Sequence, residues 1–216
     1  MLSNRPGSIR SGALVVVLCL AWIGADPTPS RSEEAAPVTW DAVLTDVSTL
    51  SAQEKTDEAL ALIERAASEL PDHGFELSDL ALGVLFGAGR ADEALAAWER
   101  GLDEGYFYFI VPRLATYDAV RNQPRFRAAL ARNNQLRDIA NRGSRPEVKV
   151  ITPASYSPDR SYPLLMVLHG GNHSIAKAME RWVPGAMGDD LIIAYLQSSR
   201  MAATRSYRWD LGGVDI

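Results

Sequence analysis

This sequence has few cysteines and histidines, and it lacks the short motifs that mark common metal-binding and phosphate-binding sites. Its 216 residues include one cysteine and three histidines. A single thiol forms no internal disulfide, and the paired cysteines of a zinc site are absent. The sequence also has no His-Glu-x-x-His and no Gly-x-x-x-x-Gly-Lys segment, which excludes the metalloprotease and phosphate-loop patterns. We therefore expect neither a metal ion nor an organic cofactor.

Positive charge is also in deficit. The 22 Lys and Arg residues face 27 Asp and Glu residues, so the formal net charge is −5 and the isoelectric point is about 5.3. A protein of this sign repels a phosphate backbone, and nucleic acid is not an expected partner. Hydrophobic residues make up 47% of the chain, which is ordinary for a globular protein and predicts that most of it folds.

The first 25 residues have the three parts of an export signal. Arg5 and Arg10 precede the uncharged apolar run 13–23, and small residues follow it where a signal peptidase would cut. The run is shorter than the roughly 20 residues that a bilayer span requires, so no stable membrane span is expected. We predict a signal peptide at 1–25, a disordered linker at 26–38, and export to the periplasm or the extracellular space.

A segment of ten residues occurs twice at a spacing typical of helical repeats. Residues 57–66 read DEALALIERA and residues 92–101 read DEALAAWERG, an offset of 35 residues (92 − 57). A period of about 34 with paired helices resembles the tetratricopeptide repeat, and we predict a helical domain of this kind at 39–142. Seven residues are expected to form its facing apolar surfaces at helical spacing. They are Leu60, Ile63, Ala67, Leu77, Leu80, Ala81 and Val84.

This helical region has two interpretations. Two units are fewer than the roughly three that such arrays usually need to bury a continuous core. The region therefore either offers a surface to a protein partner or packs as a cap on the residues that follow it. The sequence slightly favours the cap, because two units define no concave face.

After a break at 141–146 the pattern changes from helices to strands. Residues 147–152 alternate and are rich in β-branched side chains. Residues 162–172 form a mostly apolar run that ends in Gly-Gly-Asn, and residues 191–196 form a second apolar run. Such runs predict strands covered on both faces, as in an α/β sheet. Ser174 is placed to cap a helix between the last two strands.

These segments resemble secreted serine esterases of the α/β-hydrolase superfamily, of the phospholipase/carboxylesterase and feruloyl-esterase-like kind. The similarity covers about the last third of the chain. It rests on residues 150–156 (VITPASY), 162–171 (YPLLMVLHGG), 194–200 (AYLQSSR) and 207–210 (YRWD). It implies a fold of the α plus α/β class, in which the helical-repeat domain precedes the first strands and helix of an incomplete α/β-hydrolase sheet at 143–216.

The resemblance further implies an oxyanion hole in the glycine turn. Its donors would be the backbone N–H groups of Gly171 and Asn172, with His169 and Gly170 as the supporting loop. The nucleophile of the family sits on a Gly-x-Ser-x-Gly elbow, which this sequence lacks. No catalytic residue is therefore expected within the chain, and the nucleophile is expected beyond Ile216.

Other polar residues near the turn have weaker interpretations. His173 and Ser174 are neighbours, but no third group is evident to orient the histidine, so we do not expect a catalytic dyad. Ser198 and Ser199 follow a strand and line either the mouth of a pocket or a solvated loop. Residues 214–216 resemble the start of the helix that precedes the elbow strand.

The sequence thus predicts a serine hydrolase that transfers the acyl group of a small-molecule or polymer ester to water, with these 216 residues inactive on their own. One alternative is a prolyl-oligopeptidase-type peptidase, which has a similar Tyr-Pro-Leu to His-Gly-Gly strand. The absence of a preceding β-propeller favours the esterase. A second alternative is a periplasmic protein-interaction module built on the helical repeats.

Overall fold

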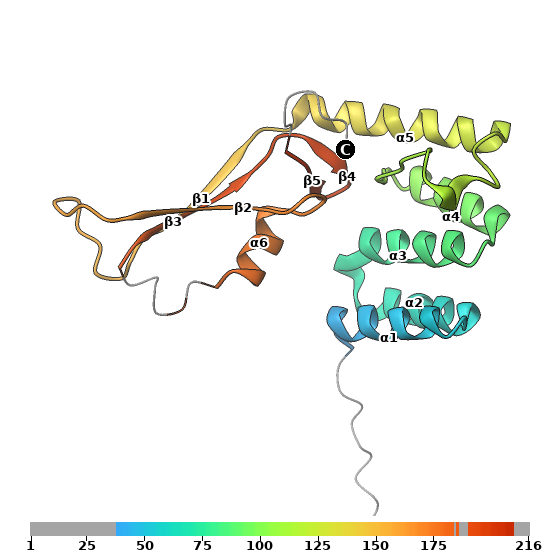
Figure 1. The fold of residues 1–216 in the computed structure, drawn as a ribbon, viewed down its shortest axis with the longest axis horizontal. Coiled ribbons are helices and arrows are strands. Elements are labelled where there is room, and N and C mark those ends of the chain that lie inside the picture. The colour runs from blue at the N-terminus through green and yellow to red at the C-terminus, as the bar shows by residue number, and fades with distance from the viewer. Residues whose placement is uncertain (1–37, 184, 186–189, 210–216) are drawn as a thin grey trace, which may run out of the picture. The chain divides into compact units, whose positions relative to one another are not determined.

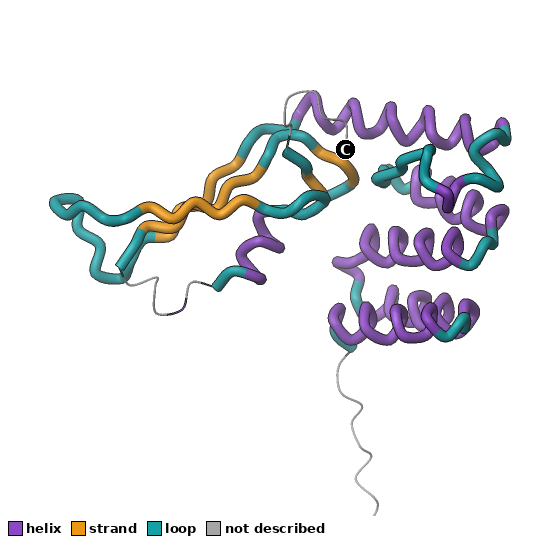
Figure 2. Tube along the Cα trace, viewed as in Figure 1, coloured by secondary structure: helices purple, strands orange, loops and turns teal. Residues whose placement is uncertain are grey.

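The computed structural model describes residues 38–183, 185 and 190–209. Helices come first along this part of the chain, and a small sheet with one further helix follows (Figures 1 and 2). The fold therefore combines α and β elements. The predicted signal peptide, the linker up to residue 37 and residues 214–216 lie outside the described residues. Within those residues, no helix has the length and apolar character needed to cross a membrane.

The helical part consists of α1 to α5. Short turns join α1 to α4, and the longer segment 104–123 links α4 to α5. Their bounds are α1 (Trp40–Ala52), α2 (Thr56–Glu69), α3 (Gly74–Gly87), α4 (Ala91–Asp103) and α5 (Pro124–Gly143), with 3-10 turns η1 (Pro71–His73) and η2 (Ala115–Tyr117). Thr39 caps α1 by accepting a hydrogen bond from the Ala42 N–H at 3.3 Å. Gly89, between α3 and α4, has a φ of +71°, which glycine adopts without strain.

The two copies of the repeated segment form α2 and α4, and each helix buries an equivalent stripe. In α2 the stripe is Ala59, Ile63 and Ala66, and in α4 it is Ala94, Trp98 and Gly101. The expectation for Ala67 was wrong, because this residue is exposed. The stripe follows steps of four and three residues, and one further residue rotates a side chain by about 100° around the helix.

The sheet is three-stranded and mixed. Strand β3 (Ile192–Gln197) lies in the middle, antiparallel to β1 (Glu147–Ile151) and parallel to β2 (Leu164–Leu168). Helix α6 (Ile175–Arg181) connects β2 to β3 and packs on one face of the sheet. The predicted cap is confirmed, because the Ser174 hydroxyl accepts a hydrogen bond from the Lys177 N–H.

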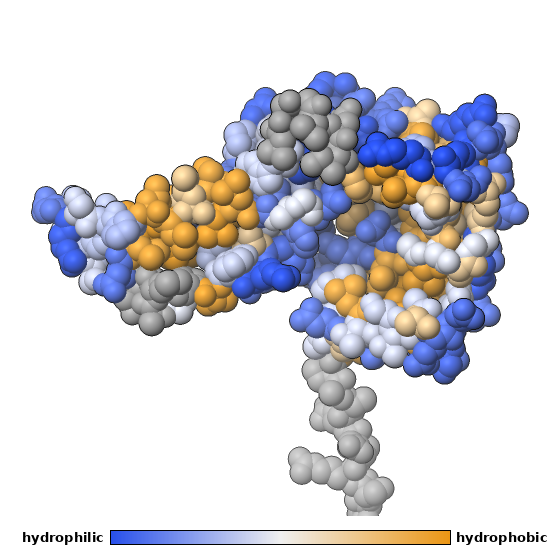
Figure 3. Space-filling model, in the orientation of Figure 1, coloured by the Kyte–Doolittle hydropathy of each residue, from blue (hydrophilic) through white to orange (hydrophobic). Residues whose placement is uncertain are grey.

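The prediction that the apolar strands are covered on both faces was wrong within the described residues. Helix α6 covers the face with Ile193 and Tyr195. The opposite face is open, and Figure 3 shows hydrophobic side chains gathered over the strands. Five of them are 54–60% exposed: Val148, Val150, Leu164, Met166 and Leu168. An apolar run predicts that both faces of a strand are shielded from water. It does not show which elements do so, because they lie elsewhere in the chain or in another molecule.

A short hairpin that the sequence did not predict follows the sheet. It consists of β4 (Met201–Ala203) and β5 (Ser206–Tyr207). Ala203 is buried in the same apolar cluster as Trp98 of α4 and Phe126 of α5. The hairpin thus completes the core of the helical part, so residues on both sides of the predicted boundary at residue 143 share one core.

Candidate functional site

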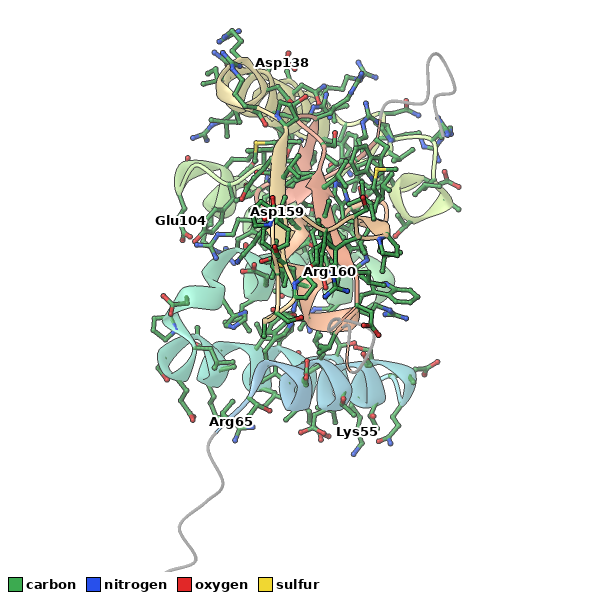
Figure 4. All side chains as sticks on the ribbon, turned by 90° about the vertical axis from the view of Figure 1, so that its left-hand side faces the viewer. Lys55, Arg65, Glu104, Asp138, Asp159 and Arg160 are labelled. Atoms are coloured by element: carbon green, nitrogen blue, oxygen red, sulfur yellow. The ribbon has the colours of Figure 1, made fainter. Side chains whose placement is uncertain are left out.

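The glycine turn lies directly after β2, at the edge of the sheet where the parallel strands β2 and β3 both end. Residues 169–173 (HGGNH) form the turn, and residues 198–200 follow β3 at the same edge. Loops outside the carboxyl ends of parallel strands form the ligand crevice in α/β sheets. The long turn at the other end of β2 carries Asp159 and Arg160, which Figure 4 labels.

His169 is buried, and both of its ring nitrogens have partners. Its Nε2 accepts a hydrogen bond from the Ser198 N–H at 3.2 Å, and its Nδ1 lies 2.7 Å from the Gly170 carbonyl oxygen. Since Nε2 is an acceptor, the proton belongs on Nδ1, which donates to Gly170. The histidine therefore ties the loop after β2 to the loop after β3, and no nitrogen remains for proton transfer.

Two aromatic residues of the last described segment hold His169 in place. Trp209 stacks on its ring with the centroids 4.7 Å apart, and the Trp209 indole N–H donates to the His169 carbonyl oxygen at 2.9 Å. Tyr207 lies at 6.3 Å from the imidazole centroid. Burial, and then the charge of Glu147, raise the pKa of Tyr207, so its phenol stays protonated at neutral pH.

The backbone N–H groups of Gly171 and Asn172 are available for a ligand. Both residues are exposed, and neither N–H has a hydrogen-bond partner within the described residues. A Cβ added at Gly171 would meet no atom within 4 Å. Asn172 has a φ of +58°, a left-handed conformation in which asparagine is enriched. The turn thus presents two adjacent donors with open space in front of Gly171.

The remaining candidate side chains do not form a catalytic pair. The Ser174 hydroxyl is engaged as the cap of α6, and no hydrogen bond joins it to His173 in the described structure. The His173 ring instead packs on Gly170, where an added Cβ would lie 3.2 Å from its Cδ2. Ser198 is buried, and its hydroxyl donates to the Arg208 carbonyl oxygen at 2.6 Å. Ser199 is exposed in the loop.

The chain was compared with known families, curated proteins and solved structures. No protein-family model matches it, and no curated protein matches it. One similar solved structure is the 2.75 Å crystal structure of an uncharacterized protein from Bacillus cereus ATCC 10987. The two chains are 18% identical, with a TM-score of 0.43. The alignment covers 81% of this chain and 56% of that one, so the present chain matches little more than half of the other protein's length.

The geometry of the turn limits its chemistry. In the described part of the chain, no group of three or more His, Cys, Asp or Glu residues is placed to hold a metal ion. The turn offers hydrogen-bond donors, while the nearby side chains of His169, Ser174 and Ser198 are all engaged. It is thus suited to hold a partial negative charge.

Proposed function

We propose that these residues are the amino-terminal part of an exported serine hydrolase that acts on carboxylic esters. The serine nucleophile, its acid and its histidine would lie beyond Ile216, and these 216 residues would be inactive alone. In this proposal α1 to α4 are two tetratricopeptide-like units, and the sheet is the first half of an α/β-hydrolase sheet. The observation that carries the proposal is the pair of unengaged N–H groups at Gly171 and Asn172.

Three features of the sheet support this proposal. The unit of β2, α6 and β3 is a parallel crossover, the building block of α/β sheets. The glycine turn stands at the carboxyl end of β2, where such sheets bind ligands. The edge of β2 away from β3 and the open apolar face leave room for further strands and helices.

An active-site label tests the proposal directly. A fluorophosphonate probe should label one serine in the product of the natural reading frame, and peptide mapping should place that serine beyond Ile216. The 216-residue chain should neither take up the probe nor hydrolyse a p-nitrophenyl acyl ester above background. A reading frame that stops at Ile216, or label on Ser174 or Ser198, would contradict the proposal.

Two substitutions of Gly171 distinguish a role as oxyanion donor from a role in supporting the fold. In the full-length enzyme, Gly171→Pro removes the N–H donor and should lower kcat by about 10²- to 10³-fold, the usual cost of losing one oxyanion donor. Gly171→Ala keeps the donor, and its Cβ meets open space. It should therefore retain activity within a few-fold. Equal loss in both variants would argue that the turn only supports the fold.

A groove in the helical part favours a second candidate, a protein-interaction module. A hollow of about 740 Å³ lies between α1 and α3. The charged residues that line it are Glu54 and Asp79, both acidic. The groove therefore suits a partner that presents a basic group.

Peptide binding tests this second candidate. A fluorescent lysine-rich peptide should bind the full chain, and Glu54→Gln with Asp79→Asn should weaken it about tenfold. Glu64→Gln, a substitution of an exposed acid outside this groove, serves as the control and should leave affinity unchanged. Equal effects of the two sets of changes would indicate non-specific attraction to an acidic protein.

A further inference from the structure

A hollow with a positive lining lies between the carboxyl-terminal half of α5 and the loop after β3. Its volume is about 460 Å³, within the range of small-molecule sites. Its charged lining residues are three arginines and one aspartate: Arg137, Arg200, Arg208 and Asp138. Figure 4 labels Asp138 on α5. Arg137 and Arg208 alone outnumber the one acidic lining residue, in a chain whose net charge is −5.

Two of these arginines lack a carboxylate partner. Arg137 and Arg208 are half-buried, and neither guanidinium forms an ion pair with a residue that the structure describes. A guanidinium carries five N–H donors in a planar fork. That fork matches the two oxygens of a carboxylate, phosphate or sulfate group, and partial burial strengthens such a contact.

The walls of the hollow are held by hydrogen bonds that do not involve these guanidinium groups. The Asn141 amide accepts from the Met201 N–H at 2.9 Å and donates to the Met201 carbonyl oxygen at 3.1 Å, which fixes α5 against β4. The Ser198 hydroxyl bonds the Arg208 carbonyl oxygen and accepts from the Arg200 N–H at 3.0 Å. The backbone walls of the hollow are thus fixed by bonds that leave the Arg137 and Arg208 guanidinium groups unused.

We propose that this hollow, the α5 pocket, binds a small oxyanion through the guanidinium groups of Arg137 and Arg208. The ligand class is a carboxylate or a phosphate, either free or as the acidic group of a larger molecule. The inference goes beyond ester hydrolysis and does not depend on it. Ser198 lines the pocket and also donates its N–H to His169 at 3.2 Å, so the pocket adjoins the loop that follows β2.

Calorimetric titration of the full chain at low ionic strength tests the proposal, with inorganic phosphate and succinate as separate probes. Saturable binding of at least one probe is expected, and the stronger probe identifies the ligand class. Arg137→Gln and Arg208→Gln should each weaken binding about tenfold or more, because each removes a charged two-pronged contact. Arg113→Gln changes an exposed arginine outside the pocket and should have no effect.

Chemical modification gives a second readout that needs no variant. Phenylglyoxal reacts with accessible guanidinium groups, and the bound probe should protect Arg137 and Arg208 but leave Arg113 reactive, as mapped by peptide mass spectrometry. The assignment is overturned by the absence of saturable binding to both probes. It is also overturned by equal weakening in the Arg113 variant, or by equal protection at all three arginines.

Discussion

Asn133 of α5 forms hydrogen bonds through both the oxygen and the nitrogen of its side-chain amide, and they fix the segment after α4. Its Oδ1 accepts hydrogen bonds from the Tyr108 N–H at 2.8 Å and the Trp98 indole N–H at 3.3 Å, and its Nδ2 donates to the Tyr108 carbonyl oxygen at 2.9 Å. Asn133 is 0% exposed. Water does not reach this position, so removal of the amide leaves three buried polar groups unpaired.

We therefore expect Asn133→Leu to lower the free energy of unfolding by about 3 kcal/mol or more, since each unpaired buried group costs about 1 to 3 kcal/mol. Urea denaturation at neutral pH measures the change. Asn134→Leu alters the half-buried neighbour, which has no such bonds, and should cost under about 1 kcal/mol. Similar losses in both variants would mean that the amide contacts contribute little.

Gly101 and Gly83 form a matched pair for testing how closely the helices pack. A Cβ at Gly101 would overlap the Tyr108 hydroxyl, whereas one at Gly83 would meet nothing within 4 Å. Gly101→Ala should destabilise the chain by about 1 to 3 kcal/mol through overpacking. Gly83→Ala should stabilise it by about 0.5 to 1 kcal/mol, because alanine favours a helix interior. Thermal melts of both variants give the sign of each effect.

The roles of single residues were the hardest part to predict from the sequence. Asparagine in a helix usually faces solvent or marks an end, and Asn141 was assigned to a break in the helical pattern. The backbone partners of Asn133 and Asn141 are 25 and 60 residues away. The α5 pocket was missed for the same reason, because Arg137 and Arg208 meet only through the tertiary fold.

At the scale of one helix, α3 carries an aspartate whose charge is disfavoured. Asp79 is an exposed residue, but it lines the groove between α1 and α3, whose walls remove part of the water around its carboxylate. This desolvation, and then the Glu76 carboxylate, raise the pKa of Asp79. The folded state therefore holds the Asp79 proton more tightly than the unfolded state, and the ionised aspartate lowers stability at neutral pH.

Asp79→Asn should accordingly raise the melting temperature at pH 7. The advantage over the parent chain should shrink as the pH falls through the raised pKa and vanish below the unfolded value near 4, where both states are protonated. Asp46→Asn, which changes an exposed acid on α1, controls for the loss of one surface charge. Melting curves at pH 7, 5 and 4 make the comparison, and a constant difference across this range would refute the assignment.

Sequence periodicity predicted the longer strands, but it did not predict the short ones. Residues 147–152 and 191–196 were predicted as strands, and β1 and β3 match them within one residue at each end. The hairpin of β4 and β5 has strands of three and two residues, too short for a recognisable alternation. Its turn also places Arg205 at a φ of +56°, where sequence rules expect glycine or asparagine.

At the scale of the whole molecule, the open face of the sheet is a hydrophobic surface without cover in the described structure. Soluble monomers rarely expose apolar patches above a few hundred Å². Val150→Lys with Met166→Lys should therefore reduce the binding of a hydrophobic dye and any concentration-dependent association, with little loss of stability. Gln135→Lys, an exposed position on α5, controls for added charge. Dye fluorescence and sedimentation give the two readouts, and no difference from the control would show that the face is shielded.

The hairpin of β4 and β5 ties the end of the described chain to the segment after α4 and to the core formed with α4 and α5. The Thr204 N–H and hydroxyl both donate to the Phe107 carbonyl oxygen, at 2.9 and 3.2 Å, and Ala203 lies in the helical core. A protease that cut the link at 144–146 would therefore leave two fragments that stay associated and elute together. Such a nicked protein should still melt in one cooperative step, with the helices and the sheet reporting the same midpoint.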